Sequence, residues 1–159
     1  MTTPFQVVDK CVEVLEDNLT DINQSRRKTQ GKWIFNKFPK FDEEMPRIGF
    51  IIASSTAEPK AVNSDKRLES LVIQCTILVD SNNEFKNPET QKTMGAEEAI
   101  DYLGDKVVNN LNRNPTIQAM DDVHYIVLTD ERGGGDITSS LVPKNLDFQV
   151  LITRGVNHD

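Results

Sequence analysis

The stretch of sequence that decides the fold is RLESLVIQCTILVD, residues 67–80, near the middle of the chain. Apolar side chains recur there at every second position, as they do along one face of an extended strand. That face carries Leu71, Ile73, Cys75, Ile77 and Val79. The opposite face also holds Val72 and Leu78. We therefore predict a central strand that is covered at least partly on both sides.

Three further segments predict strands around this one. Residues 47–54, RIGFIIAS, have the branched and aromatic content of a strand, and residues 123–129 and 145–153 follow later in the chain. The polar connection 55–66 is predicted as a loop or a projecting hairpin tip, and 130–144 as a long glycine-bearing loop. The four strands thus form two pairs, each joined across a long polar connection.

A helix is predicted before each pair of strands. Thr3, Pro4 and Gln6 open the first helix with a cap, a favoured first residue and the far end of a capping box. Its apolar stripe is Phe5, Val8, Val12, Leu15, Leu19 and Ile22. The second helix begins near Gly95 and has an apolar stripe of its own. That stripe is Ala96, Ala99, Ile100, Leu103, Val107 and Leu111.

This order, α-β-β-α-β-β, predicts an α+β fold in one domain that spans residues 1–159. We expect an antiparallel sheet of about four or five strands, packed by two helices and carrying long hairpin loops. A further short strand is predicted at residues 32–38.

The composition and charge of the chain argue against some kinds of binding partner and indicate a cellular compartment. The chain has 159 residues, 37% hydrophobic and 27% charged, with a formal charge of −7. This acidity argues against broad binding to nucleic acid or to anionic membranes. Cys11 and Cys75 lie in apolar periodic runs, which predicts two buried, reduced thiols. The chain has neither a signal-peptide core nor an apolar run of membrane-spanning length, so a reducing, cytoplasm-like compartment is expected.

Residues 26–47 depart from this acidic character. Seven basic and three acidic residues give the segment +4, which leaves −11 for the rest of the chain. Trp33, Phe35 and Phe38 are interleaved with the positive charges. Such a mixture is typical of single-stranded nucleic-acid binding. In the alternative that we prefer, the aromatic residues point into the core and the charges face water or an acidic partner, including a second copy of this chain.

Candidate catalytic, cofactor and metal sites each lack a necessary part. Gly133, Gly134 and Gly135 stand between acidic residues, without the Gly-Lys-Ser or Gly-Lys-Thr ending of a phosphate loop. His124 has Asp121 and Asp122 nearby but no second histidine or cysteine at ligand spacing. The carboxylates Glu97, Asp101 and Asp105 share one helix face, which is usually a solvated face. We therefore predict a protein that is not an enzyme and that has no catalytic residue, cofactor or metal.

The order of elements resembles the tail terminator proteins of long-tailed phages and archaeal tailed viruses, which are also called tail completion or tail-to-head joining proteins. The resemblance is carried by PRIGFII, RLESLVIQCTILVD, AEEAIDYLGDKVVNNL and the closing LDFQVLITR. It implies a hexameric ring in the virion that caps the tail tube and joins it to the head connector. It also implies assembly in the host cytoplasm, with DNA passing through the ring. The family has no catalytic residues to transfer to this chain, and it has no membrane partner.

Partner-binding residues are expected in the basic segment and in the two long connections. They are Arg26, Arg27, Lys28, Glu58, Lys60, Arg132, Gly133, Gly134 and Gly135. The alternative function is a single-stranded nucleic-acid-binding module that uses residues 26–47. An enzyme ranks third, and a pocket lined by His124 with Asp121 or Asp122 would be its first support.

Overall fold

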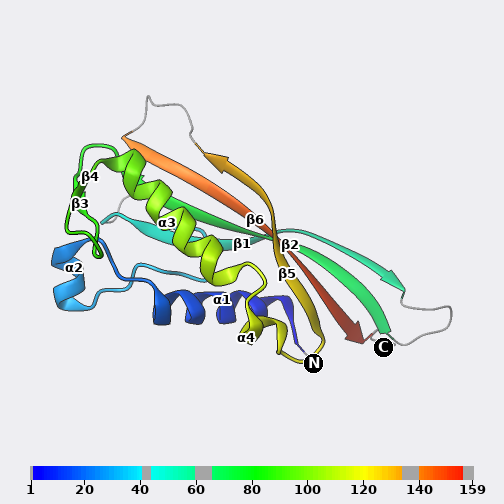
Figure 1. The fold of residues 1–159 in the computed structure, drawn as a ribbon. Coiled ribbons are helices and arrows are strands. Elements are labelled where there is room, and N and C mark those ends of the chain that lie inside the picture. The colour runs from blue at the N-terminus through cyan, green and yellow to red at the C-terminus, as the bar shows by residue number, and fades with distance from the viewer. Residues whose placement is uncertain (1, 41–43, 60–65, 134–139, 156–159) are drawn as a thin grey trace.

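The computed structural model describes residues 2–40, 44–59, 66–133 and 140–155. It has the predicted α+β fold, built on a four-stranded antiparallel sheet (Figure 1). The strand order is β1 (Arg47–Pro59), β2 (Lys66–Asp80), β6 (Leu141–Gly155) and β5 (Val123–Gly133). A separate two-stranded sheet pairs β3 (Phe85–Lys86) with β4 (Thr93–Met94).

The central strands β2 and β6 provide most of the sheet's core. Their register runs from Lys66 opposite Gly155 to Asp80 opposite Leu141, so the two strands are paired along their whole length. Between residues 71 and 79 of β2 and between 146 and 152 of β6, the helix-facing side chains are fully buried, among them Leu71, Ile73, Phe148 and Val150. On the opposite face Leu78 is buried and Val72 is half-buried. The prediction of a central strand covered partly on both sides is therefore confirmed.

Helices α1 (Pro4–Asn18) and α3 (Ala96–Leu111) lie together on one face of the sheet (Figure 1). Two short helices, α2 (Gln24–Thr29) and α4 (Pro115–Gln118), lie in the connections. The predicted capping box is present, because Thr3 N donates to Gln6 Oε1 at 2.8 Å and Gln6 N donates to Thr3 Oγ1.

The predicted apolar stripe of α1 is wrong at Phe5, which is 73% exposed. Val7, Cys11 and Val14 are buried beside Val8 and Leu15, so the buried face is centred on Cys11. At about 100° per residue, Phe5 lies well to one side of that centre. Spacing alone found the helix but not the direction of its buried face.

The predicted strand at residues 32–38 is an extended segment with a single β-bridge, between Ile34 and Ile48. Phe35 N donates to Ile48 O, and Phe50 N donates to Lys37 O at 3.1 Å. The segment thereby covers the outer edge of β1 at its first residues. Gly49 makes this approach possible, because a β-carbon there would overlap Lys37 O and lie 2.7 Å from Pro39 N.

The connection 55–66, predicted as a loop or a projecting hairpin tip, and the connection 130–144, predicted as a long loop, both contain strand. β1 continues to Pro59 and β2 begins at Lys66, while β5 reaches Gly133 and β6 begins at Leu141. The loop predictions for residues 130–133 and 141–144 are therefore wrong. For residues 55–59 the structure shows the other predicted possibility, a projecting hairpin, because β1 and β2 remain paired up to Pro59 and Arg67. Ser, Thr and charged residues can occupy a strand that is exposed to solvent, so polarity does not distinguish such a strand from a loop. Residues 60–65 and 134–139 lie outside the described part of the chain.

Both cysteines are free and fully buried, as predicted. Burial raises the pKa of the Cys11 thiol to about 12, and it raises the pKa of Cys75 well above its ordinary value. Both thiols are therefore protonated at neutral pH and pack as small apolar side chains.

Candidate interaction surfaces

Arg26, predicted to bind a partner, is instead a buried structural residue. It is 6% exposed, and its Nε donates to Asp21 Oδ2 at 2.6 Å. Its two Nη atoms donate to the carbonyl oxygens of Glu44, at 2.8 Å, and Pro46, at 2.6 Å. This guanidinium therefore ties α2 to the chain that enters β1. The prediction of Arg26 as a partner-binding residue is wrong, because a run of basic residues does not show which of them turns inward.

Arg27 and Lys28 are exposed and form the basic surface of α2. Both stand in the last turn, where positive charge interacts favourably with the helix dipole. They remain available to an acidic partner.

The aromatic residues of the basic segment are divided between core and surface. Trp33 is 8% exposed and belongs to the main hydrophobic core, with the Arg26 guanidinium 5.8 Å from its ring centre. Phe35 is half-buried, and its ring lies 5.4 Å from Lys32 Nζ and 4.4 Å from Arg47 Cζ. Phe38 is exposed. The tryptophan is thus unavailable for stacking on a base, whereas two phenylalanines remain near the surface.

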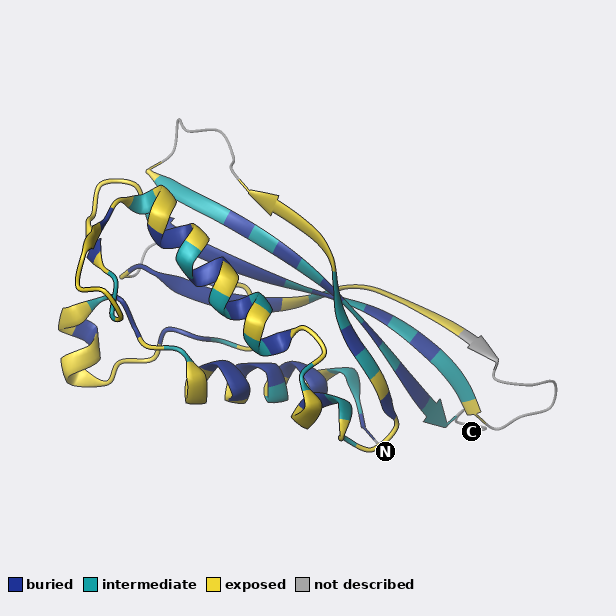
Figure 2. Ribbon diagram, in the orientation of Figure 1, coloured by how far each residue is buried: buried dark blue, intermediate teal, exposed yellow. Residues whose placement is uncertain are grey.

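The second surface is the β1–β2 arm, which we define as residues 53–59 of β1 with 66–70 of β2. In Figure 1 the arm runs on past the ends of α1 and α3. Residues 53–57 are all exposed, so both faces of the outer strand meet solvent (Figure 2). Of the two partner residues predicted here, Glu58 lies in β1 near the end of the arm. Lys60 lies outside the described residues.

A charged network occupies the helix-side face of this arm. Arg67 stands directly opposite Arg154 of β6, and Glu69 is the next residue of β2 on the same face. Glu69 is 4% exposed, and its carboxylate accepts from Ser55 Oγ at 2.6 Å and from Arg154 Nη1 at 2.9 Å. Burial opposes the ionisation of Glu69, but the hydrogen bonds from Ser55 and Arg154 outweigh it. The positive charges of Arg154 and Arg67 add to them, and the pKa of Glu69 lies below its ordinary value.

Replacing Glu69 with glutamine should lower the stability at neutral pH by about 1–2 kcal/mol, because it removes charge-assisted hydrogen bonds. Since the folded pKa lies below the unfolded value of about 4.3, this contribution is present above that pH. It is lost as the pH falls through the folded pKa. Urea unfolding of wild type and Glu69→Gln should be measured from neutral pH down to a pH below the folded pKa of Glu69. The difference between their free energies of unfolding should become smaller as the pH falls. The exposed Glu16→Gln is the control, and a gap that stays constant with pH would contradict the prediction.

The third surface is the end of the β5–β6 hairpin, where residues 129–133 of β5 are exposed. Arg132 Nη1 donates to Asp147 Oδ2 at 2.6 Å and also to Asp130. These hydrogen bonds raise the pKa of Arg132 above its ordinary value. Arg132 is thus engaged within the hairpin, and Gly133 is exposed beside it. Of the other predicted residues of this loop, Gly134 and Gly135 lie outside the described part of the chain.

Lys144 holds this hairpin against α3. Its Nζ lies 2.9 Å from Glu131 Oε1 and 3.2 Å from Asp101 Oδ1. The lysine stem packs on Gly104, where a β-carbon would lie 3.1 Å from the last three atoms of the lysine side chain. Burial lowers the pKa of Lys144, but the hydrogen bonds to Glu131 and Asp101 outweigh it and the pKa is raised. The end of the hairpin therefore has a fixed position relative to α3.

The residues considered for a catalytic or metal site are His124, with Asp121 and Asp122, and the carboxylates of α3. His124 is exposed, and its Nε2 lies 2.5 Å from Thr153 Oγ1. Within the described residues, no group of three or more His, Cys, Asp or Glu side chains is arranged to hold a metal ion. Among the carboxylates of α3, Glu97, Glu98 and Asp105 are exposed, and Asp101 pairs with Lys144. They form an acidic stripe on the outer side of the helix.

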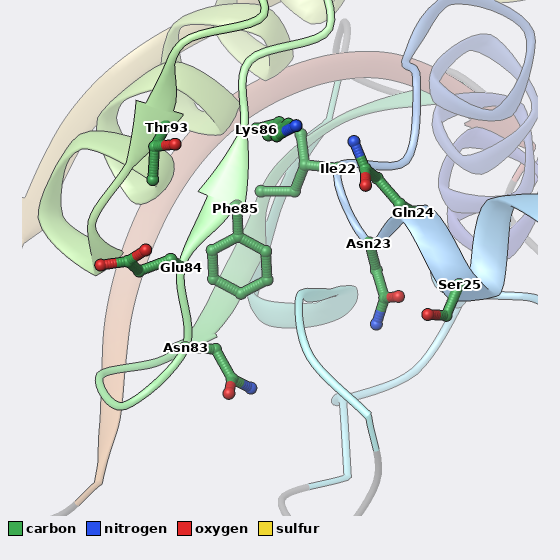
Figure 3. Close-up of a pocket in the computed structure, with 9 residues that line it drawn as sticks. All are labelled: Ile22, Asn23, Gln24, Ser25, Asn83, Glu84, Phe85, Lys86 and Thr93. Atoms are coloured by element: carbon green, nitrogen blue, oxygen red, sulfur yellow. The ribbon is translucent and has the colours of Figure 1, made fainter.

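A hollow of about 370 Å³ lies between the start of α2 and the β3–β4 hairpin (Figure 3). Ile22 and Phe85 are its buried apolar residues. Its other lining residues are polar: Asn23, Gln24, Ser25, Asn83, Glu84, Lys86 and Thr93. Asn23 is already engaged, since its Oδ1 caps α2 at Arg26 N and its Nδ2 donates to Met45 O. Such a hollow can receive a side chain of a partner.

Three charged residues at the arm were not among the predicted site residues: Arg67 and Glu69 of β2, and Arg154 of the adjoining β6. A signal for them was present, because Arg67 and Glu69 occupy the same alternate positions as Leu71 and Ile73. Charged residues at core-facing positions mark the point at which a strand runs past its apolar core.

Comparison of the chain with models of known protein families and with curated protein sequences finds no match. In the part of the chain that the structure describes, no helix is both long enough and apolar enough to cross a membrane.

Proposed function

We propose that this protein is a structural component of a virion that acts by binding other proteins. In this proposal it forms a ring, a hexamer by the resemblance to tail terminators, that caps the tail tube and joins it to the head connector. The observation that carries the proposal is the β1–β2 arm, which extends the sheet past its own helices and exposes its outer strand (Figure 2). An exposed edge strand of this kind is normally covered by a partner or protected by charge.

The distribution of surfaces supports a ring over a symmetric dimer. A ring needs two different surfaces on each subunit, one of which meets the other on the next copy. β1 and β2 are joined at the end of the sheet where Lys66 pairs with Gly155. β5 and β6 are joined at the opposite end, where Asp80 pairs with Leu141. One end therefore presents the arm, and the other presents the end of the β5–β6 hairpin and the start of α3. Two unlike ends are what head-to-tail association requires.

Single-stranded nucleic-acid binding through residues 26–47 has less support. Trp33 is packed in the core. Of the described aromatic residues in the segment, Phe35 and Phe38 remain near the surface, and Lys32 and Arg47 lie over the Phe35 ring. In this alternative, Phe35→Ala should abolish salt-sensitive binding of single-stranded DNA.

Negative-stain electron microscopy and light scattering of the purified protein test the proposed function. We expect closed rings with a single subunit number and a mass that is a fixed multiple of the 17.9 kDa chain. Association should weaken as salt is raised if charged surfaces contribute to it. A monomer, or a two-fold symmetric dimer, at the highest soluble concentration would contradict the proposal.

A further inference from the structure

In Figure 1 the ends of β1, β2 and β6 project beyond α1 and α3. We give the name notch to the helix-side face of this projecting part, which carries Arg67, Glu69 and Arg154. Figure 1 shows the arm projecting beyond the helix layer, on the side where α1 has its N-terminal end. The first turn of α1 bears Phe5, a large apolar side chain with 73% of its surface exposed. The arm contributes the side chain of Arg67 from its helix-side face, and the adjoining strand β6 contributes Arg154. Exposed aromatic and arginine residues are the types that dominate protein interfaces.

Among the residues that the structure describes, the positive charge of this notch is only partly compensated. Arg67 and Arg154 face each other across β2 and β6, a placement in which like charges repel. Glu69 forms an ion pair with Arg154, at 2.9 Å, and so offsets one of the two positive charges. The Nε atoms of both arginines are buried without an acceptor among the described residues. A carboxylate from outside cannot reach those buried atoms. Arg67 is, however, only half-buried and forms no ion pair among the described residues, so the outer end of its guanidinium is suited to a further carboxylate.

A surface of the opposite charge lies on the outer side of α3. Glu97, Glu98, Asp101 and Asp105 are all exposed there, spaced so that they lie along one side of the helix. Lys144 compensates Asp101, whereas the other three carboxylates have no ion pair among the described residues. The stripe begins at the end of the sheet opposite the arm. It therefore cannot reach the notch of its own chain, but it can reach that of another copy.

We propose that the notch binds the acidic stripe of α3 from a second copy of this chain. Arg67 and Arg154 contact the carboxylates, and Phe5 packs against the neighbouring helix. The contact joins two different surfaces, so each copy can bind one neighbour at its notch and another at its α3. The proposal rests on the self-association in the proposed function and names the interface that produces it.

Charge reversal on one side and then on both sides of this contact tests the proposal. Arg67→Glu should raise the apparent dissociation constant of self-association by about tenfold or more at low ionic strength. Glu98→Lys with Asp105→Lys should weaken association similarly. All three changes in one chain restore opposite charges across the contact, so assembly should recover. Sedimentation equilibrium measures all four proteins, and Lys92→Glu, at an exposed lysine, is the matched control for the change in charge.

A carboxylate at position 67 would lie close to Glu69, so folding has to be followed separately. Circular dichroism and thermal unfolding should be recorded for each variant. Arg67→Gln removes the charge without adding a negative one, and it should weaken association by a smaller factor. Phe5→Ala, at an exposed residue, should also weaken association while leaving the unfolding temperature almost unchanged.

Four results would overturn the inference. The first is unchanged assembly of folded Arg67→Glu or of the α3 variant, which would leave ring formation standing but place the interface elsewhere. The second is failure of the combined variant to recover. The third is a wild-type protein that stays monomeric, which counts against the proposed ring as well. If Arg67→Glu instead loses DNA binding and still self-associates, the notch serves an anionic polymer and the inference is wrong.

Discussion

Arg26→Ala should lower the free energy of unfolding by about 3–5 kcal/mol, the largest loss that we expect from any single charged residue. The substitution leaves the Asp21 carboxylate buried without its partner, at a side chain that is 6% exposed. It also removes the donors to the carbonyl oxygens of Glu44 and Pro46, which hold the start of β1. Urea unfolding followed by circular dichroism measures the effect.

Arg27→Ala is the matched control, because it removes the same group from the neighbouring, exposed position. We expect it to change the stability by no more than about 0.5 kcal/mol. If both alanine variants lose the same small amount, the buried role of Arg26 is wrong. The contrast also bears on function, since reversing the charge of Arg26 would disrupt the fold before it tested any interface. Experiments on the basic surface of α2 should use Arg27 and Lys28 alone.

Gly49→Ala should destabilise the protein by about 3 kcal/mol, because this site is already fully packed. The added β-carbon would overlap the Lys37 carbonyl oxygen and Pro39 Cδ, and the rigid ring of Pro39 cannot move away as a flexible side chain can. To relieve the overlap, residues 37–39 must lift from β1 and lose the hydrogen bond from Phe50 N to Lys37 O. Thermal and urea unfolding report the loss.

Gly133→Ala provides the comparison, because a β-carbon there meets nothing within 4 Å. It should be close to neutral in the same measurements. Equal stability of the two alanine variants would contradict the packing of residues 37–39 on β1. Such a result would also reopen the question of what covers the first part of the edge of β1.

The basic segment has a structural role that its composition does not show. This role follows from the burial of Arg26 and Trp33 and from the close packing of residues 37–39 on Gly49. Its buried members attach residues 26–39 to the core and to the edge of β1, while Arg27, Lys28 and Phe38 remain outside. The segment therefore combines an anchoring part with a smaller exposed part. Only the exposed part is available to a partner.

Periodicity in the sequence determined the main elements, because burial on one side imposes a repeat of two on strands and of 3.6 on helices. It located β2, β6, α1 and α3, and with them the α+β class. It also identified the capping box of α1 and the burial of both cysteines. Each of these follows from residues that are close in sequence, so no knowledge of distant contacts is needed.

Tertiary structure alone decided which charged residues are buried and where the sheet extends past its helices. Arg26 is inward because Asp21 and two carbonyl oxygens converge on it, and Phe5 is outward because the buried face of α1 is centred on Cys11. Arg67 and Arg154 face each other because of the register of β2 against β6, which the sequence pattern alone does not specify. The physical reason is that a local pattern records the kinds of side chain present. The direction of each side chain depends on contacts between segments far apart in the chain.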